Sequence, residues 1–576
     1  MILSLLSQLQ SHDEYNEWTI QEGGCRGLAP SINPKVQENA FLSPFQPAHQ
    51  VKILAVGSGS FLLSLVTALF ESGLSKFDVL LTDSAAAHRQ RLAECVEQAR
   101  AAHPEASVKE IDFPKNAEIP WREAVRPYDA VLFVSQKSRI EELQVLHAAC
   151  REEKKVFLPA IRARQVGLAG PLVHPDSEGC WESSWRRIHQ CALIKDAHSQ
   201  PFSSEAGALL ANVIAFDLAK SVTGAAKPEL KDQIFCLDLR TLEGSYYSFI
   251  PHPLVTGHRP IKQIQDLHEQ IERSTGRNAS NGLFSFFNGL TSAVSGIFHT
   301  WEEGELGQLP LFQCLVQAVD PLSDGPADLL PEMACAGLTH GEARREAGLS
   351  GIEAYVSRLA SRALTTPASN RSSDNHKIGP QEYVGIGAGE TIDEAVCRGL
   401  QQWLEEDLAR QVSAGQKPSV IPARLGEMED ELCRYYLQAL TQMQGTPVIG
   451  LGEERVGFPV IWVGANGCWY GCAGLNTTWA LRLSLQRALL RAQNESTCLI
   501  AQGVEAPSVH LEEKTSPSLV ISSGERSAQA EILQLSLQAL KRNRKRLLTL
   551  DMAMEPFLRE GLGGVVGVLV REEDAL

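Results

Sequence analysis

The sequence of 576 residues lacks the features that mark membrane and secreted proteins. No uninterrupted apolar run approaches the ~18 residues that a membrane-spanning helix needs. The 13 cysteines are odd in number and scattered, whereas a small secreted domain would show a dense disulfide framework. These absences predict a cytoplasmic chain that does not bind a membrane.

Positive charge is also in short supply. The chain has 53 Lys and Arg against 69 Asp and Glu, so its formal net charge is −16. A chain of this charge repels a phosphate backbone on average, and we do not expect nucleic acid as a partner. One local basic run, 541–546, is interpreted as a solvated helix face. The remaining composition, 44% hydrophobic and 21% charged, is typical of a folded protein with several domains.

From residue 51 onward, short apolar runs alternate with helical patterns. An apolar run that ends in glycine or a polar residue is typical of a buried parallel strand. Regular alternation of strands and helices predicts an α/β fold with a doubly wound parallel sheet of the Rossmann type. We expect strands at 51–56, 77–82, 108–111, 129–134 and 155–158, and helices at 61–72, 85–102 and 139–152.

The rest of the chain is less regular. We divide it into an irregular segment at 1–48, the Rossmann-like domain at 49–255, a linker with helical structure at 256–330 and an α+β domain at 331–576. Within these segments we expect a loop-rich stretch at 170–204, helices at 206–221, 391–411 and 478–495, strands at 234–239, 246–250 and 460–463, and a polar loop at 365–375.

A glycine-containing turn follows the first predicted strand. Gly57 and Gly59 fill two of the positions that a nucleotide-binding turn needs, whereas Leu62 takes the third. Asp83 ends the second strand, near the place where an acid would bind a ribose. On its own the pattern fits either a nucleotide site or a strand-helix turn without a ligand.

The residues after Asp83 narrow this choice. The group His88-Arg89-Gln90-Arg91 resembles the Arg-Gln group with which enzymes related to ubiquitin-activating enzyme hold ATP. Those enzymes place a magnesium-binding Asp after the fourth strand, where this chain has Ser135-Gln136. Because magnesium needs hard oxygen ligands, adenylation is expected to be absent or weak. The resemblance implies a vestigial nucleotide site without an ATP cofactor, made of Gly57, Gly59, Asp83, Arg89 and Arg91.

The same relatives hold zinc with two Cys-x-x-Cys pairs. The first pair should lie near Cys180, which has no second cysteine beside it, and the second should follow Pro253, where there is none. We therefore expect neither zinc nor another metal. Cys180 could be a nucleophile assisted by His174, or a structural cysteine in a loop over the sheet, and the second interpretation is favoured.

Several segments together resemble a known family, the ThiF-like thiazole-containing bacteriocin maturation proteins. They are 51–66, 81–83, 134–136 and 170–183, and the most specific part is 174–187. The resemblance covers the chain from about Val51 onward. It implies an auxiliary protein that binds a precursor peptide and delivers it to an azoline-forming cyclodehydratase of the YcaO type. Family members begin with a peptide-recognition module, and residues 1–48 look like an irregular remnant of it.

The C-terminal region resembles a YcaO-type domain, the half of such cyclodehydratases that uses ATP. The likeness lies in the glycine-rich run 385–389 before Glu394 and in 470–475 before Arg487. The positions where a working domain carries acids are Gln402, Glu405 and either Leu490 or Arg491, so one acid remains. This pattern fits a degenerate domain, or two amphipathic helices of similar appearance.

Three hypotheses follow. The first is a non-catalytic partner protein that docks on a cyclodehydratase and its precursor peptide, with a homodimer among the open oligomeric states. The second is a divergent ATP-dependent adenylating enzyme of the ThiF/MoeB type. The third is a remnant that depends on a separate peptide-recognition protein.

Overall fold

The computed structural model describes most of the chain from residue 51 onward. The remnant predicted at 1–48 and nearly all of the polar loop predicted at 365–375 lie outside the described residues. The described ranges are 51–82, 86–111, 119–137, 140–194, 202–224, 226–267, 269, 271, 282–365, 379, 382–494, 503–524 and 529–573.

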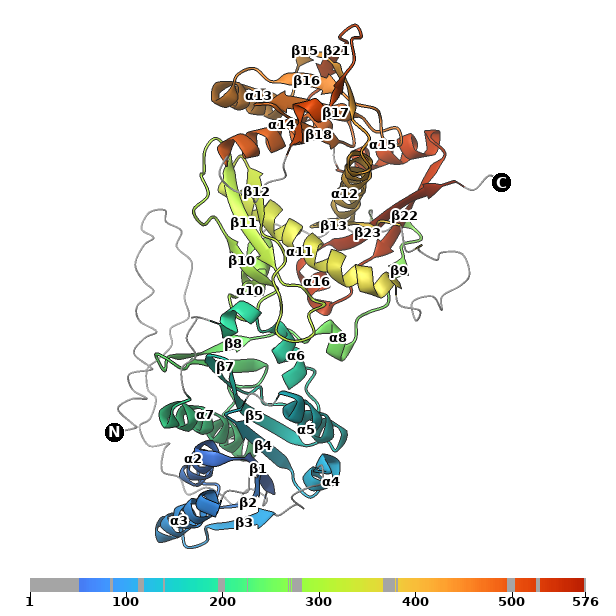
Figure 1. Cartoon of the computed structure of the whole chain (residues 1–576). Coiled ribbons are helices and arrows are strands. Elements are labelled where there is room, and N and C mark those ends of the chain that lie inside the picture. The colour runs from blue at the N-terminus through green and yellow to red at the C-terminus, as the bar shows by residue number, and fades with distance from the viewer. Residues whose placement is uncertain are drawn as a thin grey trace, which may run out of the picture. The chain divides into compact units, whose positions relative to one another are not determined.

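The N-terminal part of the described chain is built on an 8-stranded sheet with the order β3-β2-β1-β4-β5-β6-β7-β8 (Figure 1). The strands from β3 to β5 are parallel, as predicted, and β6 to β8 extend the sheet in antiparallel fashion. The sheet is therefore mixed, and the predicted parallel sheet describes only the five strands from β3 to β5. The strands are β1 (Ile53–Gly57), β2 (Lys76–Leu81), β3 (Ser107–Ile111), β4 (Ala130–Ser135), β5 (Val156–Ala163), β6 (Val166–Ala169), β7 (Gln233–Asp238) and β8 (Gly244–Ser248).

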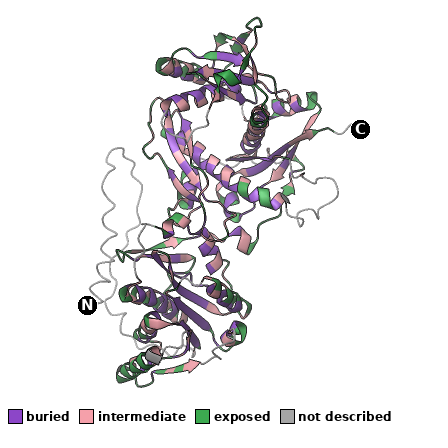
Figure 2. Cartoon of the chain, in the orientation of Figure 1, coloured by how far each residue is buried: buried purple, intermediate pink, exposed green. Residues whose placement is uncertain are grey.

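Helices cover both faces of this sheet. Side chains alternate along a strand, so Ile53 and Ala55 join one apolar cluster while Leu54 and Val56 join the cluster on the other face. Both clusters are buried (purple in Figure 2). The first cluster includes α2 (Gly59–Glu71), α3 (Ala86–Ala102) and α7 (Ser204–Thr223), and the second α4 (Trp121–Val125), α5 (Ile140–Glu152) and α6 (Trp181–Arg187).

One helix, α7, is long and apolar enough to cross a membrane by length and composition alone. Half of its most apolar stretch, 50%, is buried inside the protein, and its residues Leu210, Ile214 and Leu218 belong to the cluster that also contains α2. Ser203 caps its first turn by accepting a hydrogen bond from the backbone of Ala206. Such burial is typical of a core helix.

The predicted linker at 256–330 contains more regular structure than its sequence indicates. Besides α8 (Pro253–Thr256) and α10 (Leu283–Leu290), it holds the strands β9 (Lys262–Gln263), β10 (Phe298–Glu302) and β11 (Phe312–Ala318). Strands β10 and β11 form an antiparallel sheet with β12 (Met333–Gly337). In β11, FQCLVQA, apolar residues alternate with glutamine except at Leu315, and Cys314, Val316 and Ala318 are buried on one face. This alternation is typical of a strand, and the sequence analysis did not single it out. The expected loop at 170–204 likewise contains α6 and the short helix η3 (Gln190–Leu193).

The C-terminal part combines helices with a 4-stranded sheet, β13-β23-β22-β9, a 6-stranded sheet, β19-β18-β17-β16-β14-β20, and the pair β15-β21. The helices are α11 (His340–Thr365), α12 (Ile392–Ser413), α13 (Glu431–Gln444), α14 (Thr477–Gln493), α15 (Gln529–Arg542) and α16 (Pro556–Gly561). The strands are β13 (Gly385–Gly389), β14 (Ser419–Pro422), β15 (Arg424–Met428), β16 (Val448–Leu451), β17 (Val460–Ala465), β18 (Cys468–Ala473), β19 (Val504–Glu505), β20 (His510–Leu511), β21 (Ser518–Ile521), β22 (Lys545–Asp551) and β23 (Gly564–Glu572).

Polar caps fix where the long C-terminal helices begin. Thr391, Asp430 and Asn476 each accept a hydrogen bond from the backbone three residues onward, at the starts of α12, α13 and α14. The basic run at 541–546 is not a single helix face, because α15 ends at Arg542 and β22 begins at Lys545. Of the two residues between them, Arg544 has a φ of 54°, which turns the chain from helix to strand.

Candidate functional site

The predicted nucleotide turn lies at the carboxyl edge of the parallel strands. Gly57 ends β1, and a Cβ there would lie 2.5 Å from a methyl carbon of Val134 in β4, so strand packing alone requires a glycine. Gly59 opens α2 with a φ of +68°, and a Cβ there would have no neighbour within 3.8 Å, the nearest being at 3.9 Å. Leu62, at the third position, is buried in the core under α2. Only Gly59 therefore keeps a backbone conformation suited to an approaching ligand.

The position after β4, where the sequence resemblance implied a magnesium-binding acid, carries an amide. The Gln136 side chain donates a hydrogen bond from Nε2 to Ser60 Oγ at 2.9 Å, on the first turn of α2. Ser135 accepts a hydrogen bond from the backbone of Lys137 at 3.3 Å. Neither group offers the anionic oxygen that a magnesium ion prefers. Among the described residues of this turn, the polar groups bind one another.

The remaining predicted site residues do not join this turn in one place. Arg89 lies on α3, and its Nε forms an ion pair with Glu110 of β3 at 2.6 Å. Arg91 lies on the same helix and is exposed. Asp83 lies outside the described residues. The structure thus brings Gly57 and Gly59 together and ties Arg89 to the neighbouring strand.

Cys180 has a structural position. It is the residue before α6, its side chain is buried, and its Sγ lies 3.7 Å from Ser183 Oγ. His174, the base considered for it, is half exposed and lies 3.6 Å from Asp176 Oδ2. Arg151 Nη1 also contacts this sulfur at 3.8 Å, but no contact among the described residues brings a base to it. A buried thiol in contact with a hydroxyl and a guanidinium group but no base is poorly suited to attack a substrate.

A second polar site lies beside α12. The glycines of β13 let the strand approach this helix closely: a Cβ on Gly387 would lie 2.0 Å from the carbonyl oxygen of Ala395, and one on Gly385 would lie 2.2 Å from that of Gly399. The run Gly385–Gly389 therefore serves strand-helix packing. It also places the end of β13 and the first turns of α12 next to α11.

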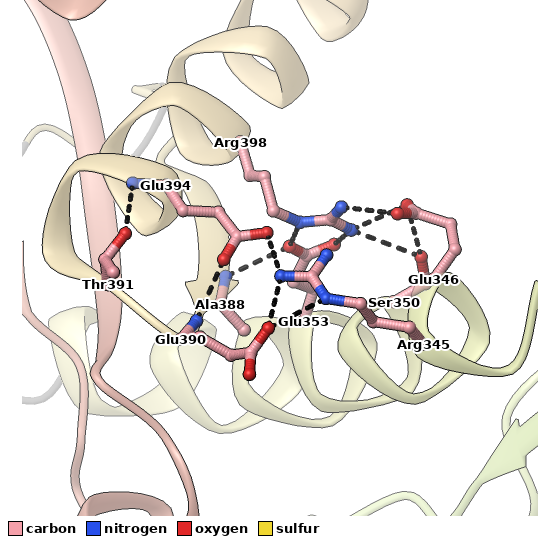
Figure 3. A network of polar contacts seen from close by, with 9 residues as sticks. All are labelled: Arg345, Glu346, Ser350, Glu353, Ala388, Glu390, Thr391, Glu394 and Arg398. Carbon is pink, nitrogen blue, oxygen red and sulfur yellow. Dashed lines mark hydrogen bonds and ion pairs between the residues drawn. The ribbon is translucent and has the colours of Figure 1, made fainter. Parts of the chain in front are cut away.

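Arg398 of α12 is at the centre of the polar network between these elements (Figure 3). Its Nε donates to Glu353 Oε1 at 2.6 Å, and its two terminal nitrogens bind Glu346 at 2.7 and 2.8 Å. Glu353 also accepts a hydrogen bond from the backbone of Ala388 at 3.0 Å. Because Glu346, Ser350 and Glu353 recur at helical spacing, one face of α11 supplies all three of these side chains.

Arg345 forms the other half of the network. It donates to Glu390 Oε2 at 2.9 Å and to Glu394 Oε1 at 2.6 Å. Glu394 accepts a further hydrogen bond from the backbone of Glu390 at 2.9 Å, while its own backbone N–H is capped by Thr391. Two guanidinium groups thus share four carboxylates (Figure 3).

The network has four carboxylates for two guanidinium groups, and part of it is buried. Glu353 has a relative exposure of 8%, and burial raises the pKa of its carboxyl, an effect that the facing Arg398 offsets only in part. The Glu394 side chain is also buried, whereas the Glu346 side chain is 40% exposed. The site can hold a positive charge, and two arginines of the chain already supply it.

The acid that remains at the YcaO-like positions is also paired. Glu405 Oε2 accepts from Arg487 of α14 at 2.5 Å, and Gln401 donates to Glu405 Oε1 at 3.0 Å. Gln402 accepts a hydrogen bond from the backbone of Ile386 in β13 at 2.5 Å. Arg491 is half buried on α14. Gln402 and Glu405 therefore bind other groups of this chain.

Sequence reasoning missed the contribution of α11. Arg345, Glu346 and Glu353 lie on a helix that the sequence analysis did not single out, far along the chain from Arg398. Their regular spacing, with acids and a base on one face, was the available signal. Their partners could not be read from the sequence, because the β13 glycines decide how close α12 lies.

Comparisons with known proteins give a likeness of fold. No protein-family model matches the sequence, and no curated protein does. A solved heterocyclase in complex with substrate and cofactor shares 12% identity, with a TM-score of 0.54, over 91% of this chain and 81% of its own. The heterocyclase TruD shares 14% identity, with a TM-score of 0.49, over 91% and 79%. MccB of E. coli shares 14% identity, with a TM-score of 0.30, over 36% of this chain and 66% of its own. The chain thus has a mixed α/β fold similar to that of a heterocyclase over most of its length.

Proposed function

We propose that this protein is a non-catalytic partner in the biosynthesis of azole-modified peptides, which delivers a precursor peptide to a cyclodehydratase of the YcaO type. The fold supports the proposal, since it is similar to that of a heterocyclase over 91% of the chain. The family resemblance of the segment 170–187 and of the first strand supports the same pathway. The ThiF-like and YcaO-like identities of the two parts belong to this proposal.

One observation carries the non-catalytic part. Each carboxylate that the network beside α12 brings together, and Glu405 on the same helix, is paired with an arginine of this chain. Magnesium-triphosphate chemistry needs acidic oxygens that can bind the ion. Replacing Arg398 or Arg345 by an ion would break partly buried pairs and strand a guanidinium group, which is energetically costly.

Reconstitution tests the delivery function. The purified chain is added to its cyclodehydratase and full-length precursor peptide, and ring formation is followed by mass spectrometry as the loss of one water per ring. We expect faster ring formation with the full precursor and no such gain with a precursor that lacks its leader. Equal rates with and without the folded chain would refute the proposal.

The second candidate is an ATP-dependent enzyme, and one observation favours it: the network has four carboxylates for two guanidinium groups. Calorimetry with Mg-ATP separates the candidates. The non-catalytic proposal expects no heat of binding. Binding that is lost in Glu353→Gln but kept in Glu382→Gln, a carboxylate paired with Arg571 elsewhere, together with precursor-dependent ATP turnover, would favour the enzyme instead.

A further inference from the structure

Three metal-binding side chains converge at a place that neither the family resemblance nor the proposed function uses. The ligand atoms of His189, Cys191 and His299 all lie within 4.8 Å of one another. His189 is fully buried, His299 is half buried and Cys191 is exposed. The Nδ1 atoms of the two histidines are 3.0 Å apart, and Cys191 Sγ is 4.0 Å from His299 Nδ1.

The backbone around His189 fixes two of these residues. His189 follows α6, and its N–H donates to the carbonyl of Val294 at 2.8 Å. The next residue, Gln190, donates to the carbonyl of Ala327 at 2.9 Å and opens the short helix η3, on which Cys191 lies. Two of the three metal-binding side chains, those of His189 and Cys191, thus come from a segment whose backbone is hydrogen-bonded to Val294 and to Ala327.

The third metal-binding side chain, that of His299, lies at a β-bulge in its strand. In β10 the pairing with β11 shifts register between Phe298 and Thr300, so His299 is the residue at the bulge. A bulge redirects a side chain and is often found where a strand contributes to a site. Here it accompanies a histidine whose Nδ1 faces a second histidine from a distant segment.

The hydrogen bond on the far side of His189 prepares its ring for a metal. Its Nε2 lies 2.8 Å from the carbonyl oxygen of Gly296. Because a carbonyl only accepts, Nε2 carries the hydrogen and Nδ1 presents its lone pair to the cluster. Metal-binding histidines are commonly oriented in this way by a backbone carbonyl.

The separations suit a tetrahedral zinc ion after small movements. With zinc bonds of ~2.0–2.1 Å to nitrogen and ~2.3 Å to sulfur, two nitrogen ligands are roughly 3.3 Å apart and a nitrogen and a sulfur roughly 3.6 Å. The observed 3.0 and 4.0 Å differ from these values by a few tenths of an ångström, and the third separation, between His189 and Cys191, is at most 4.8 Å and would have to close to the nitrogen-sulfur value. Cys191, the residue that must move most, is exposed on a short helix.

We propose that His189, Cys191 and His299 form a three-ligand site for Zn²⁺, with the fourth position open to solvent. On binding, the thiol of Cys191 loses its proton to solvent and the Nδ1 proton of His299 moves to Nε2, so that both present lone pairs. The site differs from the absent Cys-x-x-Cys pairs, and it departs from the expectation of a metal-free chain. It would connect the segment after α6 to β10.

Cobalt provides a spectroscopic test on the full chain. Protein freed of metal under reducing conditions is titrated with Co²⁺, which in a thiolate site gives a sulfur-to-metal charge-transfer absorption, and Zn²⁺ is then added to displace it. We expect one ion per chain and loss of the charge-transfer absorption in Cys191→Ser. The affinity should fall about tenfold or more in His299→Ala, as expected when a metal site is disturbed.

Matched variants keep the result interpretable. Cys95→Ser and His174→Ala, which alter residues outside the cluster, should bind Co²⁺ as the unmodified chain does. Zn²⁺ should raise the unfolding temperature of the unmodified chain and of these controls but not of Cys191→Ser, which alters an exposed side chain. The same absorption in Cys191→Ser, or no binding by the unmodified folded chain, would overturn the proposal.

Discussion

At the scale of single residues, the contribution of an ion pair to the stability of the folded chain depends on how deeply the pair is buried. Glu353 is largely buried and depends on Arg398, whereas Asp551 and Arg559 form a pair whose side chains are 34% and 47% exposed. A buried carboxylate that loses its cation becomes an uncompensated charge, while an exposed one is solvated by water. The two ion pairs have similar lengths, 2.6 and 2.5 Å, but we expect their loss to have unequal effects on stability.

Replacing Arg398 with alanine should lower the free energy of unfolding by about 3–5 kcal/mol, because Glu353 is left buried without its cation. Arg559→Ala should cost about 1 kcal/mol or less, since its pair is exposed. Urea unfolding at neutral pH measures both. A small effect of Arg398→Ala would show that the network contributes little to stability.

Asp430 should make stability depend on acid. Burial alone would raise the pKa of its carboxyl, but the hydrogen bonds from Arg482, Cys433 and Gly524 outweigh it and the pKa is lowered. The unfolded chain therefore binds the proton more readily, and the free energy of unfolding should fall as the pH drops below about 4. Urea unfolding between pH 7 and pH 3 should show a shallower acid-dependent loss in Asp430→Asn, which keeps a capping oxygen. An unchanged slope would contradict this assignment.

At the scale of elements, glycines determine how closely α12 packs on β13. The alternate glycines of β13 bring its backbone against α12, and Gly399 in the helix meets them from the other side. This contact also sets the position of Glu394 and Arg398, which lie on the first turns of α12. The polar network is therefore a consequence of close strand-helix packing.

Gly387→Ala should destabilise the protein by at least about 1–3 kcal/mol, because the added methyl group would overlap the helix backbone. Gly289→Ala is the matched control: it lies inside α10, where a Cβ meets nothing within 4 Å. That substitution should be neutral or stabilising by about 0.5–1 kcal/mol, as alanine favours a helix. Thermal and urea unfolding of the two variants distinguish these outcomes, and similar losses in both would contradict the packing argument.

At the scale of the whole molecule, a buried polar triad joins distant parts of the sequence. Arg187 of α6 donates to Tyr355 of α11 at 2.8 Å and to Glu555, at the start of α16, at 2.7 Å. The Tyr355 hydroxyl donates to Glu555 at 2.6 Å, and all three side chains are almost fully buried. We therefore expect the triad to couple the stability of α6 to that of the C-terminal helices.

Tyr355→Phe should lower the free energy of unfolding by about 1–3 kcal/mol, because two buried charged groups lose a hydrogen-bond partner. Hydrogen exchange should accelerate in both β4 and β23 if the triad couples the two regions. Tyr435→Phe, whose hydroxyl binds a backbone carbonyl at 39% exposure, serves as the control with a smaller effect. Faster exchange confined to β23 would argue against coupling.

The sequence alone determined many of the local elements and the parallel part of the large sheet. Short apolar runs located β1 and its neighbours, and the helices predicted at 391–411 and 478–495 lie close to α12 and α14. These features depend on residues that are close together in the sequence, so a local sequence pattern can predict them. The absence of an acid after β4 could also be read directly, because Gln136 occupies that position.

Only the tertiary structure decided which charges meet. Arg398 and Glu353 come from different helices, the triad spans Arg187 to Glu555, and the His189–His299 pair depends on a bulge in a strand that the sequence did not reveal. A side chain pairs with whatever the backbone brings within about 3 Å of it, and that distance is set by packing between elements. The spacing of residues in the sequence does not give the distance between side chains of different elements, so the polar sites could be seen only in the folded chain.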